Sequence, residues 1–151
     1  MLRKQNLINL KTEKEGIKVL KEAIPSFFVP SKSEKEIIYE KLNIDFKKYS
    51  RSVDGIILNV DTISDILNEN DVILVEIKST KAKNIKKLPY GVFFGITKNE
   101  EDLFKSLNNY RLCIVHTLSK EYIFLNFTEY ESLIKNKRIQ YQVNFKKEIE
   151  S

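Results

Sequence analysis

A run of aliphatic residues at positions 72–78, VILVEIK, constrains the fold of this chain more than any other feature. Five of its seven residues are aliphatic, which is typical of a β-strand buried on both faces. Two ionisable residues, Glu76 and Lys78, interrupt the run near its end. Burying such groups costs several kcal/mol unless they pair or bind a metal ion. The strand therefore either ends in solvent or carries these residues for a function.

Length and composition favour one compact domain over residues 1–151. Of the 151 residues, 42% are hydrophobic and 31% are charged, which is enough for a single core. No apolar run is long enough to cross a bilayer, and no short apolar stretch resembles a signal peptide. We therefore expect a soluble, cytoplasmic protein with no membrane partner.

The sulfur and imidazole groups of the chain do not suggest a zinc site. Cys113 is the single cysteine and lies inside an apolar run, which is typical of core packing. His116 is the single histidine and directly follows that run. Zinc sites need several such ligands, so we expect none.

Helix starts are indicated by capping boxes, in which Ser or Thr is followed three residues later by Glu. The pattern occurs at Thr12 and Glu15, Ser33 and Glu36, Thr97 and Glu100, and Thr128 and Glu131. We expect the first helix to end at about Ala23, because Pro25 blocks its continuation. The other three are expected at residues 34–42, 99–109 and 129–135.

Strand-length runs of β-branched and aromatic residues alternate with these helices. They lie at residues 27–29, 53–60, 72–78, 91–96, 112–116, 122–125 and 139–145. The alternation predicts a mixed α/β (α+β) domain. We expect the strands at 53–60 and 72–78 to form an antiparallel pair with an elaborated connection.

The expected pairing brings three ionisable side chains together. Period-two alternation places Glu76 and Lys78 on the same face of their strand. If Asp54, at the start of the preceding strand, lies opposite the far end of residues 72–78, a second carboxylate comes beside Glu76. Two carboxylates and a backbone carbonyl can hold Mg²⁺, which keeps several waters and meets phosphate oxygens. A nearby lysine can orient or deprotonate a water, or stabilise charge on the phosphate.

These residues resemble the D…(D/E)-x-K signature of the PD-(D/E)XK, or restriction-endonuclease-like, nuclease superfamily. Asp54 is followed after a hairpin-length gap by Glu76-Ile77-Lys78, although Val53 stands where the signature has Pro. The segments VEIKST and FFGITKNEEDLFKSLNNYRLCIV resemble the nuclease-like domain at the C-terminus of NO VEIN proteins and related restriction-enzyme modules. The resemblance covers roughly residues 53–115. It implies a restriction-endonuclease-like core, with a mixed central sheet flanked by helices.

The resemblance also implies roles for individual residues. Asp54, Glu76 and Lys78 would be catalytic. Asp54, Glu76 and the carbonyl of Ile77 would bind Mg²⁺, for which Mn²⁺ would substitute.

A further metal ligand could come from the first helix, because many nucleases of this superfamily place a glutamate there. Glu15, or Glu13 beside it, is the candidate. Glu15 is also the third residue after Thr12 in a capping box, which would give it a structural role instead.

A basic stretch directly after the strand is the expected DNA-binding element. The chain has a net charge of +5, and residues 78–87 contain five lysines and no acid. This charge could bind a phosphate backbone, or it could belong to a solvated loop. The lysines that would contact DNA are Lys81, Lys83, Lys86 and Lys87.

The sequence therefore favours a Mg²⁺-dependent endonuclease of double-stranded DNA. A small type II restriction endonuclease fits its size, as does the cleaving small subunit of a heteromeric one. Cutting both strands would need a homodimer or a heterodimer with a larger recognition subunit. The alternatives are a structure-selective nuclease resembling Holliday-junction resolvases, a non-catalytic nucleic-acid or partner-binding module, and a plain surface pair at Glu76 and Lys78.

Overall fold

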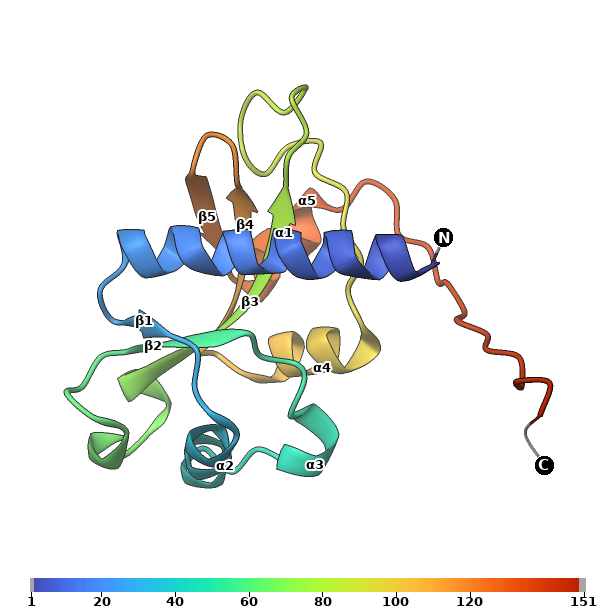
Figure 1. The fold of residues 1–151 in the computed structure, drawn as a ribbon. Helices are drawn as coiled ribbons and strands as arrows, with labels where there is room; N and C mark the ends of the chain where they lie inside the picture. The colour runs from blue at the N-terminus through green and yellow to red at the C-terminus, as the bar shows by residue number, and fades with distance from the viewer. Residues whose placement is uncertain (1, 150–151) are drawn as a thin grey trace.

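The structure is a computed structural model that describes the backbone of residues 2–149 and the side chains of residues 12–149 (Figure 1). Helices and strands alternate along the chain, and two short 3₁₀ helices lie between the second and third strands. In chain order the elements are α1 (Leu2–Ala23), β1 (Phe27–Phe28), α2 (Lys32–Lys41), α3 (Phe46–Tyr49), β2 (Gly55–Leu58), η1 (Ile63–Asp65), η2 (Glu69–Asp71), β3 (Val72–Thr80), α4 (Lys98–Ser106), β4 (Tyr110–His116), β5 (Glu121–Leu125) and α5 (Phe127–Leu133).

The strands form one mixed sheet in the order β1-β2-β3-β4-β5. β3 and β4 are parallel, and the other neighbouring strands are antiparallel. A parallel pair requires a long crossover connection, which here consists of the loop after β3 and helix α4. The mixed α/β architecture expected from the sequence is confirmed, and so is the antiparallel pairing of β2 with β3.

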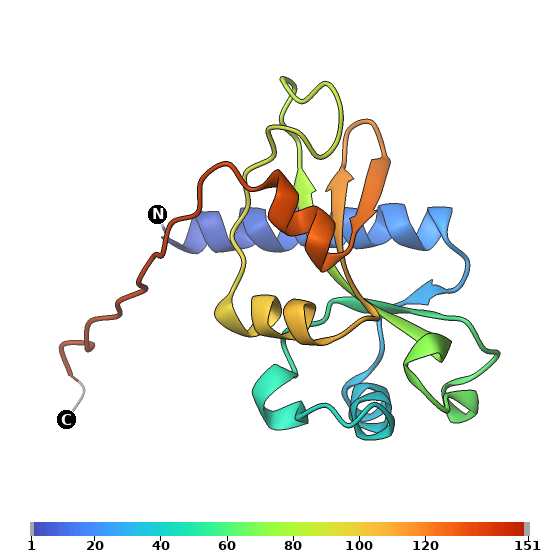
Figure 2. The ribbon, with the colours of Figure 1, turned by 180° about the vertical axis from the view of Figure 1, so that it is seen from behind.

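Helices cover both faces of the sheet. α1 crosses one face, seen in Figure 1, while α4 and α5 lie on the other, seen in Figure 2. Val75 and Ile77 of β3 pack on the α1 side with Leu20, whereas Val72 and Leu74 pack on the opposite side. The alternation confirms that β3 is buried on both faces, because each of its faces belongs to a separate apolar cluster.

The predicted boundaries of the first and third helices are correct at one end only. α1 ends at Ala23, as expected before Pro25, but it extends back to Leu2, so the predicted start at Thr12 is wrong. α4 has the predicted N-cap, Thr97, and a complete capping box to Glu100, but it ends at Ser106, three residues before the predicted end. No helix among residues 2–149 combines the length and apolar character needed to cross a membrane.

The starts predicted for the second and fourth helices are each two residues late. α2 is capped by Ser31 with Glu34, and α5 by Asn126 with Glu129. Before α2 two overlapping boxes, starting at Ser31 and at Ser33, satisfy the pattern, so the pattern alone cannot choose between them. The cap of α5 is an asparagine, which a pattern restricted to Ser and Thr does not include. The path of the chain out of β1 or β5 selects the earlier cap, since each helix begins within a few residues of the preceding strand.

Two predicted strands are not formed. Residues 91–96 have no regular structure and lead into α4, because both edges of β3 are already paired with β2 and β4. Residues 139–145 also lack regular structure and run away from the body of the molecule (Figure 2). A strand requires a neighbouring strand, and neither segment has one among the described residues.

Candidate functional site

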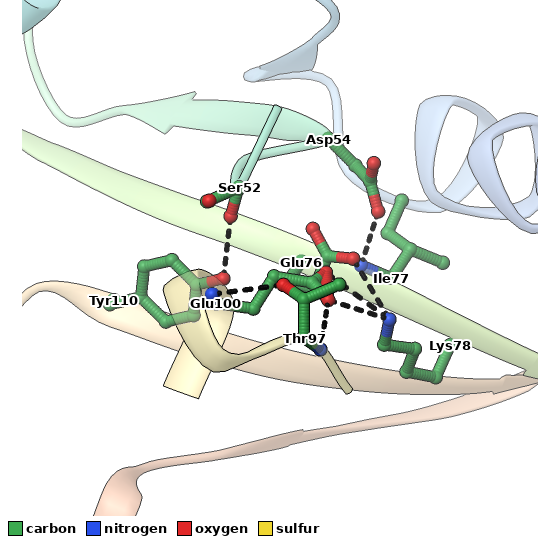
Figure 3. A network of polar contacts seen from close by, with 8 residues as sticks. All are labelled: Ser52, Asp54, Glu76, Ile77, Lys78, Thr97, Glu100 and Tyr110. Atoms are coloured by element: carbon green, nitrogen blue, oxygen red, sulfur yellow. Dashed lines mark hydrogen bonds and ion pairs between the residues drawn. The ribbon is translucent and has the colours of Figure 1, made fainter. Parts of the chain in front are cut away.

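Asp54 directly precedes the first residue of β2, beside the part of β3 that extends beyond the β2 pairing. The register pairs Gly55 with Val75, which places Asp54 beside Glu76 as the sequence predicted. The backbone N–H of Asp54 donates to the Val75 carbonyl at 2.8 Å. Its carboxylate Oδ2 accepts from the Ile77 N–H, also at 2.8 Å (Figure 3). The side chain of Asp54 therefore replaces a missing backbone partner of β3, which is a structural role in addition to any chemical one.

The backbone leading into Asp54 is held by two side chains from other elements. Tyr110 at the start of β4 donates its hydroxyl to the Ser52 carbonyl at 2.6 Å. Lys35 of α2 donates to the carbonyls of Ser50 and Val53 at 2.8 and 2.9 Å. These contacts position Asp54 relative to β3.

Glu76 and Lys78 lie on the same face of β3, as period-two alternation predicted. Glu76 is 4% exposed, and the Nζ of Lys78 lies 3.1 Å from its Oε1. The second oxygen, Oε2, is buried and accepts no hydrogen bond from a described donor. When it carries a proton, the Glu76 carboxyl group can instead donate to the neighbouring carboxylates of Asp54 and Glu100. A solvated strand end is excluded, because Glu76 is as inaccessible as the core.

Glu100 is a fourth member of the site, and the sequence did not assign it there. It is the N3 residue of α4, is 5% exposed, and its Oε2 lies 3.2 Å from Lys78 Nζ (Figure 3). Its Oε1 also accepts from the backbone N–H of Thr97 at 2.8 Å. The capping box was visible in the sequence, but the burial of its glutamate against β3 depends on the crossover connection.

The electrostatics of the site follow from burying several carboxyl groups together. Burial, then contact with Glu100 and repulsion from Asp54, raise the pKa of Glu76 to about 11. Burial also raises the pKa of Asp54 above its ordinary value, despite the hydrogen bond from Ile77. Glu76 therefore holds a proton near neutral pH when no cation is bound.

Lys78 and Glu100 stay charged in this environment. Burial acts to lower the pKa of Lys78, but attraction to Glu76 and Glu100 outweighs it and leaves the pKa raised. Burial acts to raise the pKa of Glu100, and its contacts with Glu76, Lys78 and Thr97 outweigh this and lower it. The resting site thus contains an ammonium held by an ionised Glu100.

Helix α1 brings one carboxylate to Asp54, and it belongs to Glu13. α1 crosses β3 closely at Gly16, where a Cβ would lie 2.2 Å from the Ser79 Oγ. One turn earlier, burial and the neighbouring Asp54 raise the pKa of Glu13. Glu15 instead pairs with Lys81, with its Oε2 2.9 Å from the Nζ. Of the two glutamates considered on this helix, the geometry places Glu13 with the site.

The donor set could accommodate Mg²⁺, although the described side chains, residues 12–149, contain no group of three or more His, Cys, Asp or Glu arranged to hold a metal ion. Mg²⁺ is commonly bound through one or two carboxylates and keeps several waters. Asp54 and Glu76 supply two adjacent carboxyl groups, and the mutual repulsion that raises the pKa of Glu76 is what a bound cation would relieve. The carbonyl of Ile77 faces the same edge of β3 as its N–H, which donates to Asp54.

The four expected DNA-binding lysines are exposed but do not form one group. Lys83, Lys86 and Lys87 line a shallow pocket with His116, in the loop beyond the end of β3. Lys81 lies apart from them in its pair with Glu15. The loop rises above the sheet at the opposite end of the molecule from α2 and α3 (Figure 1).

Cys113, expected to pack in the core, and the single histidine, His116, are both buried. Cys113 is fully buried in the cluster under α1, where burial raises the pKa of its thiol. The Nε2 of His116 lies 2.9 Å from the Ala82 carbonyl, and its Nδ1 accepts from the Ser119 N–H at 3.3 Å. This pattern makes Nε2 the donor, so His116 holds the loop after β3 against the turn after β4.

Comparisons with protein-family models, curated proteins and solved structures find no match to this chain. The site is therefore interpreted from its geometry and from the resemblance noted in the sequence.

Replacement of Glu76 by Gln tests the raised pKa. A raised pKa means that the protonated form stabilises the fold fully below the ordinary value of 4.5, and that this stabilisation is lost as the pH rises towards about 11. Gln mimics the protonated acid and cannot ionise. In EDTA, we expect the stability of Glu76→Gln relative to wild type to increase between about pH 5 and about pH 9, measured by urea unfolding.

The exposed Glu40, replaced by Gln, is the matched control and should show no such trend. An identical pH dependence in wild type and Glu76→Gln would mean that Glu76 is ionised in the folded protein, contrary to the geometry described here.

Proposed function

We propose that this chain is a Mg²⁺-dependent endonuclease that hydrolyses phosphodiester bonds in double-stranded DNA. The observation that carries the proposal is the grouping of Asp54, Glu76 and Lys78 beside the start of β2, with Glu76 buried. Burial of these groups costs free energy, and a bound cation would offset that cost.

The architecture supports the same proposal at a coarser level. A mixed five-stranded sheet with helices on both faces agrees with the restriction-endonuclease-like core that the sequence resemblance implies. The grouped residues come from β3 and the segment before β2, as that resemblance requires.

Asp54 and Glu76 would hold Mg²⁺ together with the carbonyl of Ile77, and Glu13 is the α1 carboxylate available to join them. When bound, the ion would polarise the phosphodiester and lower the pKa of a water ligand. Metal binding requires ionised carboxylates, so Glu76 would lose its proton on loading.

Lys78 would act as a charged donor. Its raised pKa favours orientation of the attacking water, or stabilisation of charge on the phosphate, over proton abstraction in the resting protein. Glu100 would position Lys78 by accepting from its Nζ at 3.2–3.3 Å while its own carboxylate is held by the capping box.

The proposed biological role is that of a small type II restriction endonuclease or of the cleaving subunit of a heteromeric one. Residues 2–149 hold one such grouping, so cutting both strands would require two copies or a larger partner subunit. Recognition of a sequence would then rest on loops of this domain or on the partner.

The decisive test is cleavage of supercoiled plasmid by the purified chain. We expect nicked and linear products in Mg²⁺ or Mn²⁺, and none in EDTA. Asp54→Asn should abolish cutting while retaining an acceptor for the Ile77 N–H, so that folding is preserved. Cleavage by Asp54→Asn at the wild-type rate would refute the assignment.

The choice of substrate in this assay separates the related activities. Linear duplex with a preferred cut site supports the restriction role, whereas much faster cutting of a four-way junction supports a junction resolvase. Metal-independent DNA binding without any cutting would identify a binding module instead.

Replacement of Lys78 by Ala tests its role in chemistry. We expect the single-turnover rate to fall at least about a hundredfold, the scale of a lost electrostatic stabiliser, with DNA affinity in Ca²⁺ little changed. Lys78→Arg should not restore the rate, because a planar guanidinium cannot replace a compact ammonium between two carboxyl groups. Poor binding with normal turnover would reassign Lys78 to phosphate binding.

Neutralisation of Lys86 and Lys87 to Gln tests the basic loop. We expect weaker binding to every DNA sequence and a salt dependence of log affinity that is flatter by about two units. Lys32 and Lys47, exposed on α2 and α3 at the far end of the molecule, provide the matched double control (Figure 1). Equal effects of the two double variants would exclude the loop as a specific DNA contact.

A further inference from the structure

Residues 139–145 read IQYQVNF and alternate strictly between apolar and polar side chains. Such alternation is typical of a strand with one buried face. The apolar side chains are nevertheless exposed: Ile139 by 85%, Tyr141 by 85%, Val143 by 72% and Phe145 by 94%. The segment therefore has the pattern of a strand without the surface that such a strand would cover.

One edge strand of the sheet, β5, has an outer side that could receive such a strand. β5 pairs with β4 on one side, and no described strand pairs with its outer side. The opposite edge strand, β1, has only two residues and could not align with a longer partner. An unpaired edge presents a row of N–H and C=O groups that can accept another strand.

We propose that residues 139–145 of one copy of this chain add a sixth strand to the outer edge of β5 in a second copy, and that two copies exchange these strands reciprocally. The proposal defines an interaction surface and does not depend on the proposed nuclease activity.

The length of the segment and the aromatic side chains on one face of β5 both fit this arrangement. The segment has seven residues and β5 has five, so β5 could be paired along its whole length. Tyr122 and Phe124 lie on one face of β5, with ring centroids 5.8 Å apart, and Tyr122 is 37% exposed. The apolar row of the added strand would lie beside these rings, and aromatic cross-strand neighbours stabilise sheets.

The geometry favours a second copy over the β5 of the same chain. Lys137, directly before the segment, is bound to Glu101 of α4, with the Nζ 2.6 Å from Oε1. From there the chain runs to the side of the molecule where α1 begins, while β5 lies on the other side (Figures 1 and 2). A second copy can meet the segment without breaking the Lys137–Glu101 pair.

Sedimentation velocity over a wide range of protein concentration tests the exchange. We expect wild type to form a dimer, and the double variant Tyr141→Lys and Val143→Lys to raise the dimer dissociation constant at least about tenfold. The matched control, Gln140→Lys and Gln142→Lys, adds the same charge to the polar face and should remain dimeric. All four side chains are exposed, so an unchanged far-UV circular dichroism spectrum should verify that each subunit still folds.

The receiving edge is tested by Tyr122→Lys, which should weaken the dimer without altering residues 139–145. Mixing this variant with the Tyr141→Lys and Val143→Lys variant should restore dimers, because one intact segment and one intact edge then meet. A monomeric wild type at all concentrations would overturn the proposal. So would an equal loss in both double variants, or a Tyr122→Lys dimer as tight as wild type.

Discussion

The ammonium of Lys78 lies between the carboxyl groups of Glu76 and Glu100, and the arrangement around β3 depends on this buried contact. Removing one partner of a buried ion pair costs about 3–5 kcal/mol, because the remaining charge is left without compensation. The contact therefore ties the central strand to the first turn of α4. It also fixes where the crossover connection must return before β4 can pair in parallel with β3.

The same constraint explains the position of Asp54. β2 pairs with β3 only as far as Gly55 and Val75, so the Ile77 N–H has no backbone partner on that side. The carboxylate of Asp54 accepts from it instead, and Tyr110 and Lys35 hold the preceding backbone in place. The mismatch in strand length thus opens a place in the sheet where a second carboxylate meets Glu76. The hydrogen bonds that satisfy the backbone around Asp54 therefore also assemble the candidate site.

Prediction from the sequence was most accurate where the signal is repeated along an element. The alternation in residues 72–78 correctly placed Glu76 and Lys78 on one face, and the antiparallel pairing placed Asp54 beside them. It was least accurate where two local patterns compete, as at Ser31 and Ser33, or where a strand needs a partner, as at residues 91–96. Glu100 was identified as the glutamate of a capping box but not as a partner of Lys78. A capping box does not indicate which residues of other elements its glutamate contacts.

The sequence by itself determined the mixed α/β class, the doubly buried β3 and the residue types at its end. These follow from local periodicity and from the cost of burying charge, which act within a single element. Only the tertiary structure decided that Glu13 rather than Glu15 approaches Asp54, and that Glu100 completes the grouping. Both depend on how helices pack on the sheet: α1 approaches β3 closely at Gly16, and α4 begins after the loop that follows β3. Such distances arise from packing between segments far apart in the chain, and no pattern within either segment contains them.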